Sequence, residues 1–300
     1  MRSTDDTATS FSLEGVSGGD QHHFGGIWTE IKLEALKKYL TAFNTALKKQ
    51  KFSRYYIDAF AGTGRCDIKV DGQTRSIDGS ARVALSASPP FHKFYFIELS
   101  TRKLSALDEL KGEYPNKNIE IIHGDANATL RNICNKRRWK NERAVLFLDP
   151  FGMDVEWATL EVITKTRAID TWYLFPYAGM YRQAAKSTAA LSADKQASLT
   201  RVLGTDEWRR EFYIPNPQSD LFGDSHDIRE AGHRQMLDFV SSRLKSLFPA
   251  VIGPKVLYQR GAAGEPYGSP LFALYFAASN PNPNAHSLAT KIAKDILDTL

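Results

Sequence analysis

The sequence has few of the residues that crosslink small secreted proteins or build metal sites. It contains two cysteines in 300 residues, Cys66 and Cys134, and no Cys-x-x-Cys pair. This argues against a disulfide framework and against a structural zinc site. The seven histidines show no spacing typical of metal ligands. We therefore expect no metal, and free thiols in a reducing cytoplasm.

Long apolar runs are also missing. No stretch of about 18 apolar residues is present, so the sequence predicts no membrane span. Residues 1–26 lack the charged-then-apolar pattern of a signal peptide and are rich in Ser, Thr, Gly and Asp. We expect this segment to be a disordered leader.

The overall composition is that of a soluble globular protein, with 42% apolar and 24% charged residues. The net charge is +5 and the pI about 9.0. This balance favours an anionic partner such as nucleic acid, although it is far from that of a histone. Oligomeric state is not indicated by any pattern.

Strands alternate with helical segments from residue 27 to residue 178. A helix with apolar residues on one face is predicted over 28–51, with Thr29 as a candidate N-cap. A hairpin is predicted around Asp71-Gly72. Predicted strands are 55–57, 93–98, 119–122, 144–148, 171–175, 255–259 and 271–277. This alternation indicates a parallel sheet built of βαβ units.

The order of predicted strands and helices divides the chain after the leader into three parts. Residues 27–178 form the predicted core, 179–250 show only helical and loop patterns, and 251–300 supply the last strands and a closing helix. We expect the middle part to be a helical insertion.

Four acids lie at or just after the ends of four successive strands: Asp58, Glu98, Asp125 and Asp149. The carboxyl ends of parallel strands meet at one edge of a sheet, where nucleotide-like ligands bind. The sequence therefore predicts a ligand site at this edge.

The turn after the first strand lacks the features of a phosphate cradle. Gly62-Thr63-Gly64 is followed by Asp67 where a dinucleotide fingerprint has its third glycine. The Gly-Lys-Ser/Thr of a P-loop is absent too. A ligand without phosphates fits better, with Glu98 accepting hydrogen bonds from both hydroxyls of a ribose.

These motifs resemble those of a known superfamily. The segments are 28–33, 57–62, 96–98, 124–127, 148–152 and 271–279. Together they resemble class I S-adenosylmethionine-dependent methyltransferases and, more narrowly, the three-Cys-motif partner family, over roughly residues 24–300. The resemblance implies a Rossmann-like α/β fold: a seven-stranded, mostly parallel sheet with helices on both faces. It also implies a partner protein that has the three-cysteine motif, and the family has no well-established substrate.

The superfamily resemblance assigns cofactor roles by position, with S-adenosyl-L-methionine as the ligand. It implies that Asp58, Phe60, Gly62 and Gly64 frame the methionine part, Glu98 binds the ribose, and Asp125 and Ala126 meet the adenine.

The motif Asp149-Pro150-Phe151-Gly152 gives the catalytic hypothesis. It resembles the Asp-Pro-Phe-Gly of tRNA guanosine N2-methyltransferases and differs from the Asp/Asn-Pro-Pro-aromatic motif of other base-amine methyltransferases. We expect Asp149 and the Pro150 carbonyl to hold a target amine while Phe151 stacks on the base. The alternative is a cofactor-pocket turn without base recognition.

Other candidate substrate contacts are Phe175 and Tyr177, at the end of the fifth strand, and Arg138. Arg138 belongs to a basic run around Trp139 that suits phosphate contact and base stacking; a solvated helix end is the alternative.

The leading hypothesis is a cytoplasmic methyltransferase acting on an exocyclic amine of a nucleobase in RNA or DNA. One alternative is a non-catalytic protein that binds the three-cysteine partner through exposed apolar residues of the insertion, namely Leu199, Trp208, Phe212 and Phe222. A third is a small-molecule or protein methyltransferase.

Overall fold

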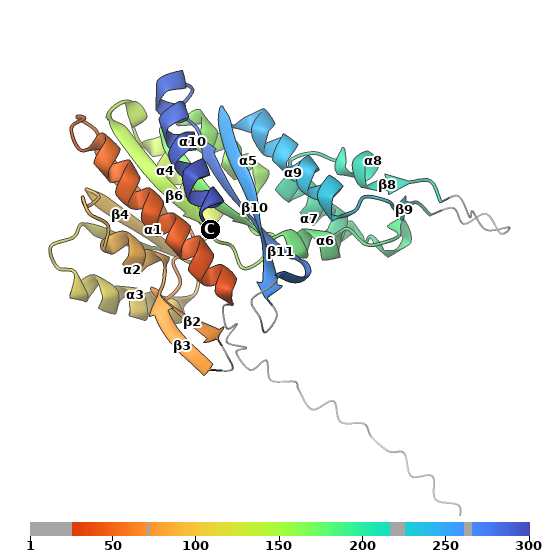
Figure 1. Ribbon diagram of the computed structural model, residues 1–300, viewed down its shortest axis with the longest axis horizontal. Coiled ribbons are helices and arrows are strands. Elements are labelled where there is room, and N and C mark those ends of the chain that lie inside the picture. Colours follow the sequence, from red (N-terminus) through yellow and green to blue (C-terminus); the bar gives the residue numbers. More distant parts are fainter. Residues whose placement is uncertain (1–25, 71–72, 217–225, 261–265) are drawn as a thin grey trace, which may run out of the picture.

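A seven-stranded sheet forms the centre of the computed structural model, which describes residues 26–70, 73–216, 226–260 and 266–300 (Figure 1). The strand order is β10-β11-β7-β6-β1-β4-β5. β11 is antiparallel to both of its neighbours, and the other pairs in the sheet are parallel. This confirms the predicted α/β fold with a mostly parallel sheet. The predicted leader lies outside the described residues except for Gly26.

The elements have the following bounds. The strands of the sheet are β1 (Ser53–Asp58), β4 (Lys93–Glu98), β5 (Ile119–His123), β6 (Glu142–Leu148), β7 (Ile169–Phe175), β10 (Ala250–Arg260) and β11 (Pro266–Ala278). Two hairpins lie outside it, β2 (Arg65–Val70) with β3 (Gln73–Asp78), and β8 (Tyr213–Ile214) with β9 (Ile228–Arg229). The helices are α1 (Ile27–Leu47), α2 (Ser80–Leu85), α3 (Thr101–Glu113), α4 (Ala126–Lys136), η1 (Trp139–Asn141), α5 (Trp157–Lys165), α6 (Tyr177–Gln183), η2 (Thr188–Ala190), α7 (Ala193–Leu203), α8 (Trp208–Phe212), α9 (His233–Leu247) and α10 (Pro283–Asp298).

The order of the strands creates a crevice between β1 and β6. Numbered along the chain within the sheet alone, the order is 3-2-1-4-5-7-6. It differs from the doubly wound order 3-2-1-4-5-6 by the antiparallel β11, which lies between β7 and β10. Chain direction across the sheet reverses between β1 and β6, so the loops after these strands diverge. Such a switch point is where open α/β sheets bind ligands.

Alternating side chains divide the core into two layers, as the period of two in a strand requires. On one face, Tyr56 and Phe96 pack with α1, α2 and α10. On the other face, Tyr55 and Ile97 pack with α4, α5 and the helices of the insertion. Both faces are therefore covered by helices, which explains why the central strands are buried almost throughout.

The insertion between β7 and β10 shares the core of the sheet. Leu199, Trp208 and Phe212 are at most 1% exposed and belong to the same cluster as Tyr173 of β7. The prediction that these three form an exposed interface is therefore wrong, and Phe222 lies outside the described residues. Their apolar faces pack inward, so they give no support to a docking role.

Several boundaries differ from the predictions. α1 has Gly26 as its N-cap, and the Thr29 amide donates to the Gly26 carbonyl at 2.8 Å. β10 begins at Ala250, five residues earlier than predicted, because it pairs with nearly the full length of β11. The two-residue strands β8 and β9 were not predicted, since two residues give no periodicity to detect.

The predicted hairpin is confirmed: β2 and β3 form an antiparallel pair outside the central sheet. Arg65 pairs with Asp78 at the base of the hairpin, and Val70 pairs with Gln73 at its far end. At its base the Gly79 amide donates to the Gly64 carbonyl at 2.9 Å, and a Cβ on Gly79 would lie 3.0 Å from the Gly64 backbone. α2 therefore begins directly beside the glycine turn, although the hairpin separates the two in sequence.

Candidate functional site

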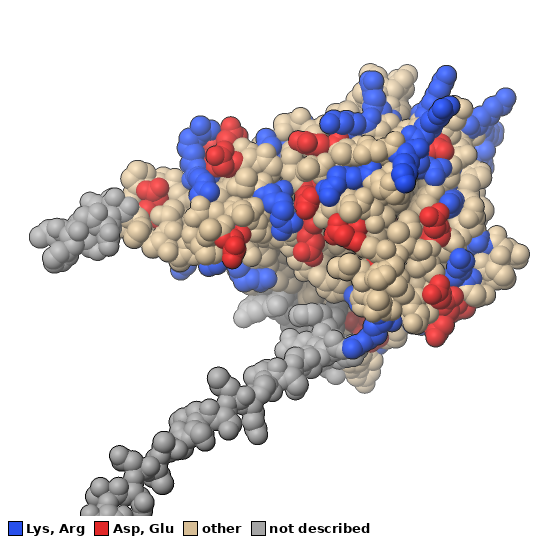
Figure 2. All heavy atoms as spheres, turned by 180° about the vertical axis from the view of Figure 1, so that it is seen from behind, with Lys and Arg blue, Asp and Glu red and all other residues tan. Residues whose placement is uncertain are grey.

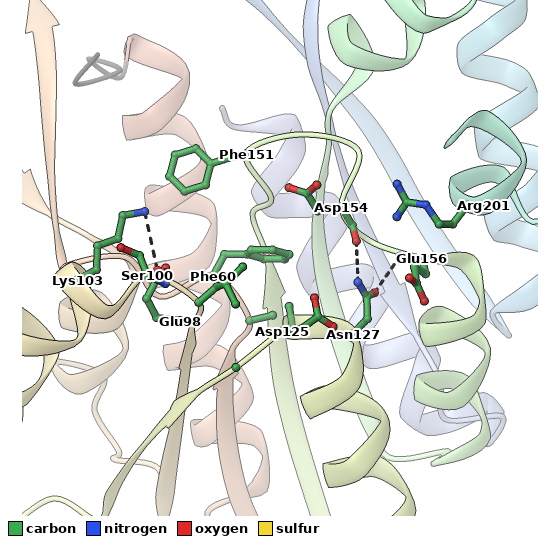
Figure 3. A pocket seen from close by; sticks show the side chains of 14 residues that line it. Phe60, Glu98, Ser100, Lys103, Asp125, Asn127, Phe151, Asp154, Glu156 and Arg201 are labelled. Atoms are coloured by element: carbon green, nitrogen blue, oxygen red, sulfur yellow. Dashed lines mark hydrogen bonds and ion pairs between the residues drawn. The ribbon is translucent and has the colours of Figure 1, made fainter. Parts of the chain in front are cut away.

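A cavity of about 490 Å³ opens at the carboxyl ends of β1, β4, β5 and β6 (Figure 3). This volume is typical of small-molecule sites, which span roughly 300–1,000 Å³. Loops after all four strands contribute to its lining, which comprises Ala59, Phe60, Glu98, Leu99, Ser100, Lys103, Gly124, Asp125, Ala126, Asn127, Phe151, Asp154, Glu156 and Arg201. The structure thus brings the predicted residues Phe60, Glu98, Asp125, Ala126 and Phe151 into one site.

Glu98 is held rigidly in the cavity wall. It is 7% exposed, and its two carboxylate oxygens accept hydrogen bonds from the Gly62 and Ser100 amides, each at 2.9 Å. The Lys103 ammonium lies 4.0 Å away. A carboxylate accepts about four hydrogen bonds, so Glu98 retains acceptor capacity for a ligand in the cavity.

The turn after β1 uses its amides within the protein. The amides of four consecutive residues donate to internal oxygens: Ala59 to Phe147 O at 3.1 Å, Phe60 to Asp58 Oδ1 at 3.4 Å, Ala61 to Ile97 O at 3.0 Å, and Gly62 to Glu98 Oε2. Gly62 has a φ of +64°, a conformation that glycine adopts without a Cβ penalty. A phosphate cradle needs unpartnered amides that converge on the ligand. These four amides do not provide one.

Asp58 lies beneath this turn and not in the cavity lining. It is completely buried and accepts a hydrogen bond from the Tyr56 hydroxyl at 3.0 Å and another from the Ser80 side chain. Burial raises the pKa of Asp58 to about 6. Its contact with the Phe60 amide makes Asp58 a support for the turn. Gly62 and Gly64 do not line the cavity either.

Asp125 and Asn127 fix the loop after β5. The Asp125 carboxylate caps α4 by accepting from the Ala128 amide at 2.8 Å. The Asn127 amide group donates to the Asp154 carbonyl at 2.8 Å and accepts from the Glu156 amide at 3.0 Å. Asn127 therefore joins the loops after β5 and β6, and these hydrogen bonds fix the spacing of the two loops in the cavity wall.

The remaining wall is made by residues that the sequence did not single out. Asp154 and Glu156 follow the Asp149–Gly152 motif, and Arg201 comes from α7 of the insertion. Phe151 is 73% exposed at the rim, with the Lys103 ammonium 4.2 Å from its ring centre (Figure 3). No spacing links Asp154, Glu156 and Arg201 to the strand-end acids, so only the folded chain shows that these three residues belong to the site.

The charge of the lining is predominantly negative. Four carboxylates line the cavity, from Glu98, Asp125, Asp154 and Glu156, against two cations, from Lys103 and Arg201. This balance disfavours a ligand with several phosphates and suits a ligand with hydroxyls and positive charge.

Asp149 forms an ion pair with Lys32 of α1, a residue 117 positions earlier in the chain. The two side chains are 22% and 11% exposed. Lys32 belongs to a segment that contributes to the family resemblance, but the sequence assigned it no role. α1 thus does more than cover the sheet, since it brings a cation to the proposed catalytic residue. Pro150 is buried beside Asp149, and the Gly152 amide donates to Asp154 Oδ2 at 3.3 Å.

The three candidate substrate residues are not brought to the cavity. Phe175 and Tyr177 are at most 2% exposed, and the Tyr177 hydroxyl is hydrogen-bonded to His233 Nδ1 at 2.8 Å. Arg138 is exposed, but it precedes β6 and therefore lies at the opposite edge of the sheet. Phe175 and Tyr177 belong to the core because α6 folds back against β11 directly after β7.

The described part of the chain lacks two further classes of site. It holds no group of three or more His, Cys, Asp or Glu side chains arranged to bind a metal ion. None of its helices is long and apolar enough to cross a membrane.

Comparison with known proteins supports the fold. No family model and no curated protein matches the sequence. Among solved structures, the chain is similar to protein LPL1258 of Legionella pneumophila, assigned to the family model DUF519, at 14% identity and a TM-score of 0.52, over 92% of this chain and 93% of that one. Human methyltransferase-like protein 13 in complex with SAH is 12% identical over 90% of this chain and 92% of its own, with a TM-score of 0.42. An rRNA methylase of Streptococcus thermophilus is 13% identical over 83% of this chain and 94% of its own, with a TM-score of 0.34.

At these identities the likeness is one of fold alone. The sheet and its topology define a class I methyltransferase fold, as predicted. Membership of the three-Cys-motif partner family, with its partner protein, stays a prediction.

Proposed function

We propose that this chain is a cytoplasmic S-adenosylmethionine-dependent methyltransferase that modifies an exocyclic amine of a nucleobase in RNA or DNA. The observation that carries the proposal is the position of Glu98, which lies in the wall of a cavity at the switch point of the sheet with acceptor capacity to spare. A carboxylate in this place binds two neighbouring hydroxyls of a ribose.

The chemistry of the lining selects among ligands that contain a ribose. S-adenosylmethionine has a cationic sulfonium, an ammonium and no phosphate. The excess of carboxylates and the occupied amides of residues 59–62 fit such a ligand better than a nucleoside triphosphate or a dinucleotide. Asp125 and Ala126 would meet the adenine, and the turn supported by Asp58 would frame the methionine part.

When bound, S-adenosylmethionine supplies a methyl group activated by the sulfonium. Asp149 accepts a hydrogen bond from the target amine and orients its nitrogen, and the Pro150 carbonyl accepts a second. Phe151, exposed at the cavity rim, stacks on the base. Asp149 is also the acceptor for the proton that the amine releases. Positioning and electrostatics therefore make up the contribution of these residues.

Lys32 extends this recognition to a second atom of the base. An ammonium has three donors, and the contact with Asp149 uses one of them. The pair thus presents an acceptor and a donor side by side. Adenine and cytosine have an amine donor next to a ring-nitrogen acceptor on one edge, as does the N2–N3 side of guanine. We infer that Lys32 donates to that ring nitrogen.

Transfer of labelled methyl groups to bulk RNA and DNA tests the proposal. Wild type should label at least one of them, and Asp149→Asn should lower the rate by about 10- to 100-fold, since hydrogen bonds to charged groups contribute about 1.5–3 kcal/mol. Lys32→Met should reduce labelling similarly, Lys32→Arg should restore part of it, and Lys37→Met, on the exposed side of α1, should leave it unchanged. A rate in Asp149→Asn equal to that of wild type would overturn the mechanism, and labelling of neither polymer would overturn the function.

A further inference from the structure

A strongly basic surface lies at the amino edge of the sheet, opposite the cavity. It is formed by the helix ends and loops that lead into β1, β6 and β7, three strands that are neighbours in the sheet. Eight exposed cations belong to it, namely Lys48, Lys49, Lys51, Lys136, Arg138, Lys140, Lys165 and Arg167. We call this set the basic edge.

No exposed acid interrupts the basic edge. In residues 48–52, 136–142 and 165–168, all of which the structure describes, the single carboxylate is Glu142. Its side chain is 19% exposed and forms an ion pair with Arg137 at 2.8 Å. Within these three segments the eight exposed cations are therefore accompanied by no exposed carboxylate, and Glu161, four residues before Lys165 on α5, is half-buried. Figure 2 shows Lys and Arg side chains gathered along the upper border of the molecule, where the strands of Figure 1 begin.

Helix dipoles explain only part of this charge. α1, α4 and α5 all end at this edge, and a cation in the last turn of a helix is favourable. Lys136 and Lys165 occupy such positions. Lys51, Arg138 and Arg167 lie beyond the last turns of these three helices, where the dipole effect has fallen off, and Lys140 lies in the three-residue η1. The excess of positive charge thus points to an anionic partner.

We propose that the basic edge binds the phosphate backbone of the nucleic acid that carries the target base. The inference rests on the proposed function and narrows its substrate to polynucleotides. β6, with seven residues, runs from this edge to Asp149, which corresponds to about 23 Å at 3.3 Å per residue. In a stacked strand, with about 3.4 Å per nucleotide, roughly seven nucleotides span this distance. A mononucleotide substrate cannot use the basic edge.

The surface favours nucleic acid over a membrane. Surface-bound membrane proteins combine cations with an apolar face that enters the lipid. Among the described residues the large exposed apolar side chains are Leu99, Phe151 and Leu288. The first two line the cavity, and Leu288 of α10 lines a hollow beside the basic edge together with Leu47 and Ala168. One exposed apolar side chain is far less than the apolar face of a membrane-inserting helix.

Binding of a fluorescent RNA of about 20 nucleotides, measured over a series of salt concentrations without S-adenosylmethionine, tests the inference. The variant Arg138→Gln/Lys140→Gln/Arg167→Gln should bind at least 10-fold more weakly. Its plot of log affinity against log salt should be shallower by about 2, because each phosphate contact contributes about 0.7 for a single strand. The matched control Lys37→Gln/Lys291→Gln/Lys294→Gln removes the same charge from exposed sites on α1 and α10 and should bind like wild type.

Substrate length provides the second measurement. The edge variant should raise the KM for methylation of the 20-nucleotide RNA and leave the KM for an RNA of about four nucleotides unchanged. Equal losses in the edge and control variants, or binding of an acidic protein in place of RNA, would overturn the inference. The two proposals can be refuted separately. RNA binding at the basic edge without binding of S-adenosylmethionine would refute the proposed methyltransferase activity and leave the basic edge as an RNA-binding surface. Methylation of the 20-nucleotide RNA that is unaffected by the edge variant would refute the role of the basic edge and leave the methyltransferase activity.

Discussion

The carboxyl groups of Asp58, which is buried, and of Asp170, which is half-buried, make the stability of the folded state depend on pH. Burial raises the pKa of Asp58 and of Asp170 to about 6 in each case, despite hydrogen bonds from Tyr56 and Tyr39, respectively. The folded state therefore binds protons that the unfolded state, with pKa values near 3.8, releases. The stability that this protonation contributes is fully present below pH 4 and is lost as pH rises through 6.

Asp170→Asn tests this at a site remote from the cavity. Asparagine keeps the shape of the side chain and an acceptor for the Tyr39 hydroxyl, but it does not ionise. We expect the variant to lose less stability than wild type between pH 4 and pH 7, by on the order of 1–3 kcal/mol. Denaturant unfolding at several pH values measures the difference, with the exposed Asp295→Asn as the control. Parallel curves for wild type and Asp170→Asn would contradict the argument.

At the scale of the element, the end of α7 depends on a glycine. Gly204 follows the helix with a φ of +69°, and a Cβ there would lie 2.1 Å from the Trp157 ring. Gly204→Ala should therefore lower the free energy of unfolding by about 1–3 kcal/mol, through both backbone strain and the clash.

Gly112→Ala is the matched substitution. Gly112 is exposed within α3, and a Cβ there has no atom within 4 Å. Alanine should stabilise the helix by about 0.5–1 kcal/mol. Thermal unfolding of both variants measures the contrast, and the same sign of change in both would show that the strain at Gly204 is unimportant.

α1 also shows how far the sequence predicts an element. Its apolar periodicity predicts the helix and its buried face, because both depend on local spacing. The ion pair of Lys32 with Asp149 depends on how the helix crosses the sheet, which involves residues 117 positions apart. The same limit applies to Arg201, whose place in the cavity follows from the packing of the insertion.

The strand-end acids were predictable for a physical reason. Each lies at or just after the end of an apolar strand, and parallel topology brings such ends to one edge, where Glu98 and Asp125 line the cavity and Asp58 and Asp149 do not. Burial of individual residues was not predictable in the same way. Phe175 ends the same kind of strand and Tyr177 begins α6, yet both side chains pack into the core. The spacing of Leu199 and Trp208 does not tell which face of a helix is buried, because that depends on the sheet against which the helix packs.

At the scale of the whole molecule, sheet and insertion form one core. Trp208 is fully buried, its indole donates to Thr200 Oγ1 at 3.0 Å, and its cluster extends to β7 and β11. Trp208→Ala should lower the free energy of unfolding by about 3–5 kcal/mol and leave a single transition.

Denaturant unfolding followed by both circular dichroism and fluorescence checks this expectation. Leu288→Ala, at a half-exposed site on α10, should change the stability by no more than about 0.5 kcal/mol. Two separate transitions in either protein would mean that the insertion folds as an independent unit.

The central claim is that the cavity beside Glu98 binds S-adenosylmethionine. Glu120→Gln, on the exposed side of β5, removes a carboxylate of the same type outside the cavity and serves as the matched control. Thermal unfolding establishes that each variant is folded before titration.

Calorimetric titration of the wild type with S-adenosylmethionine, ATP and NAD is the most direct test. We expect saturable heat with S-adenosylmethionine and none with ATP or NAD, an affinity for S-adenosylmethionine about 10- to 100-fold weaker in Glu98→Gln, and no change of affinity in Glu120→Gln. No heat with S-adenosylmethionine, or an affinity unaffected by Glu98→Gln, would contradict it.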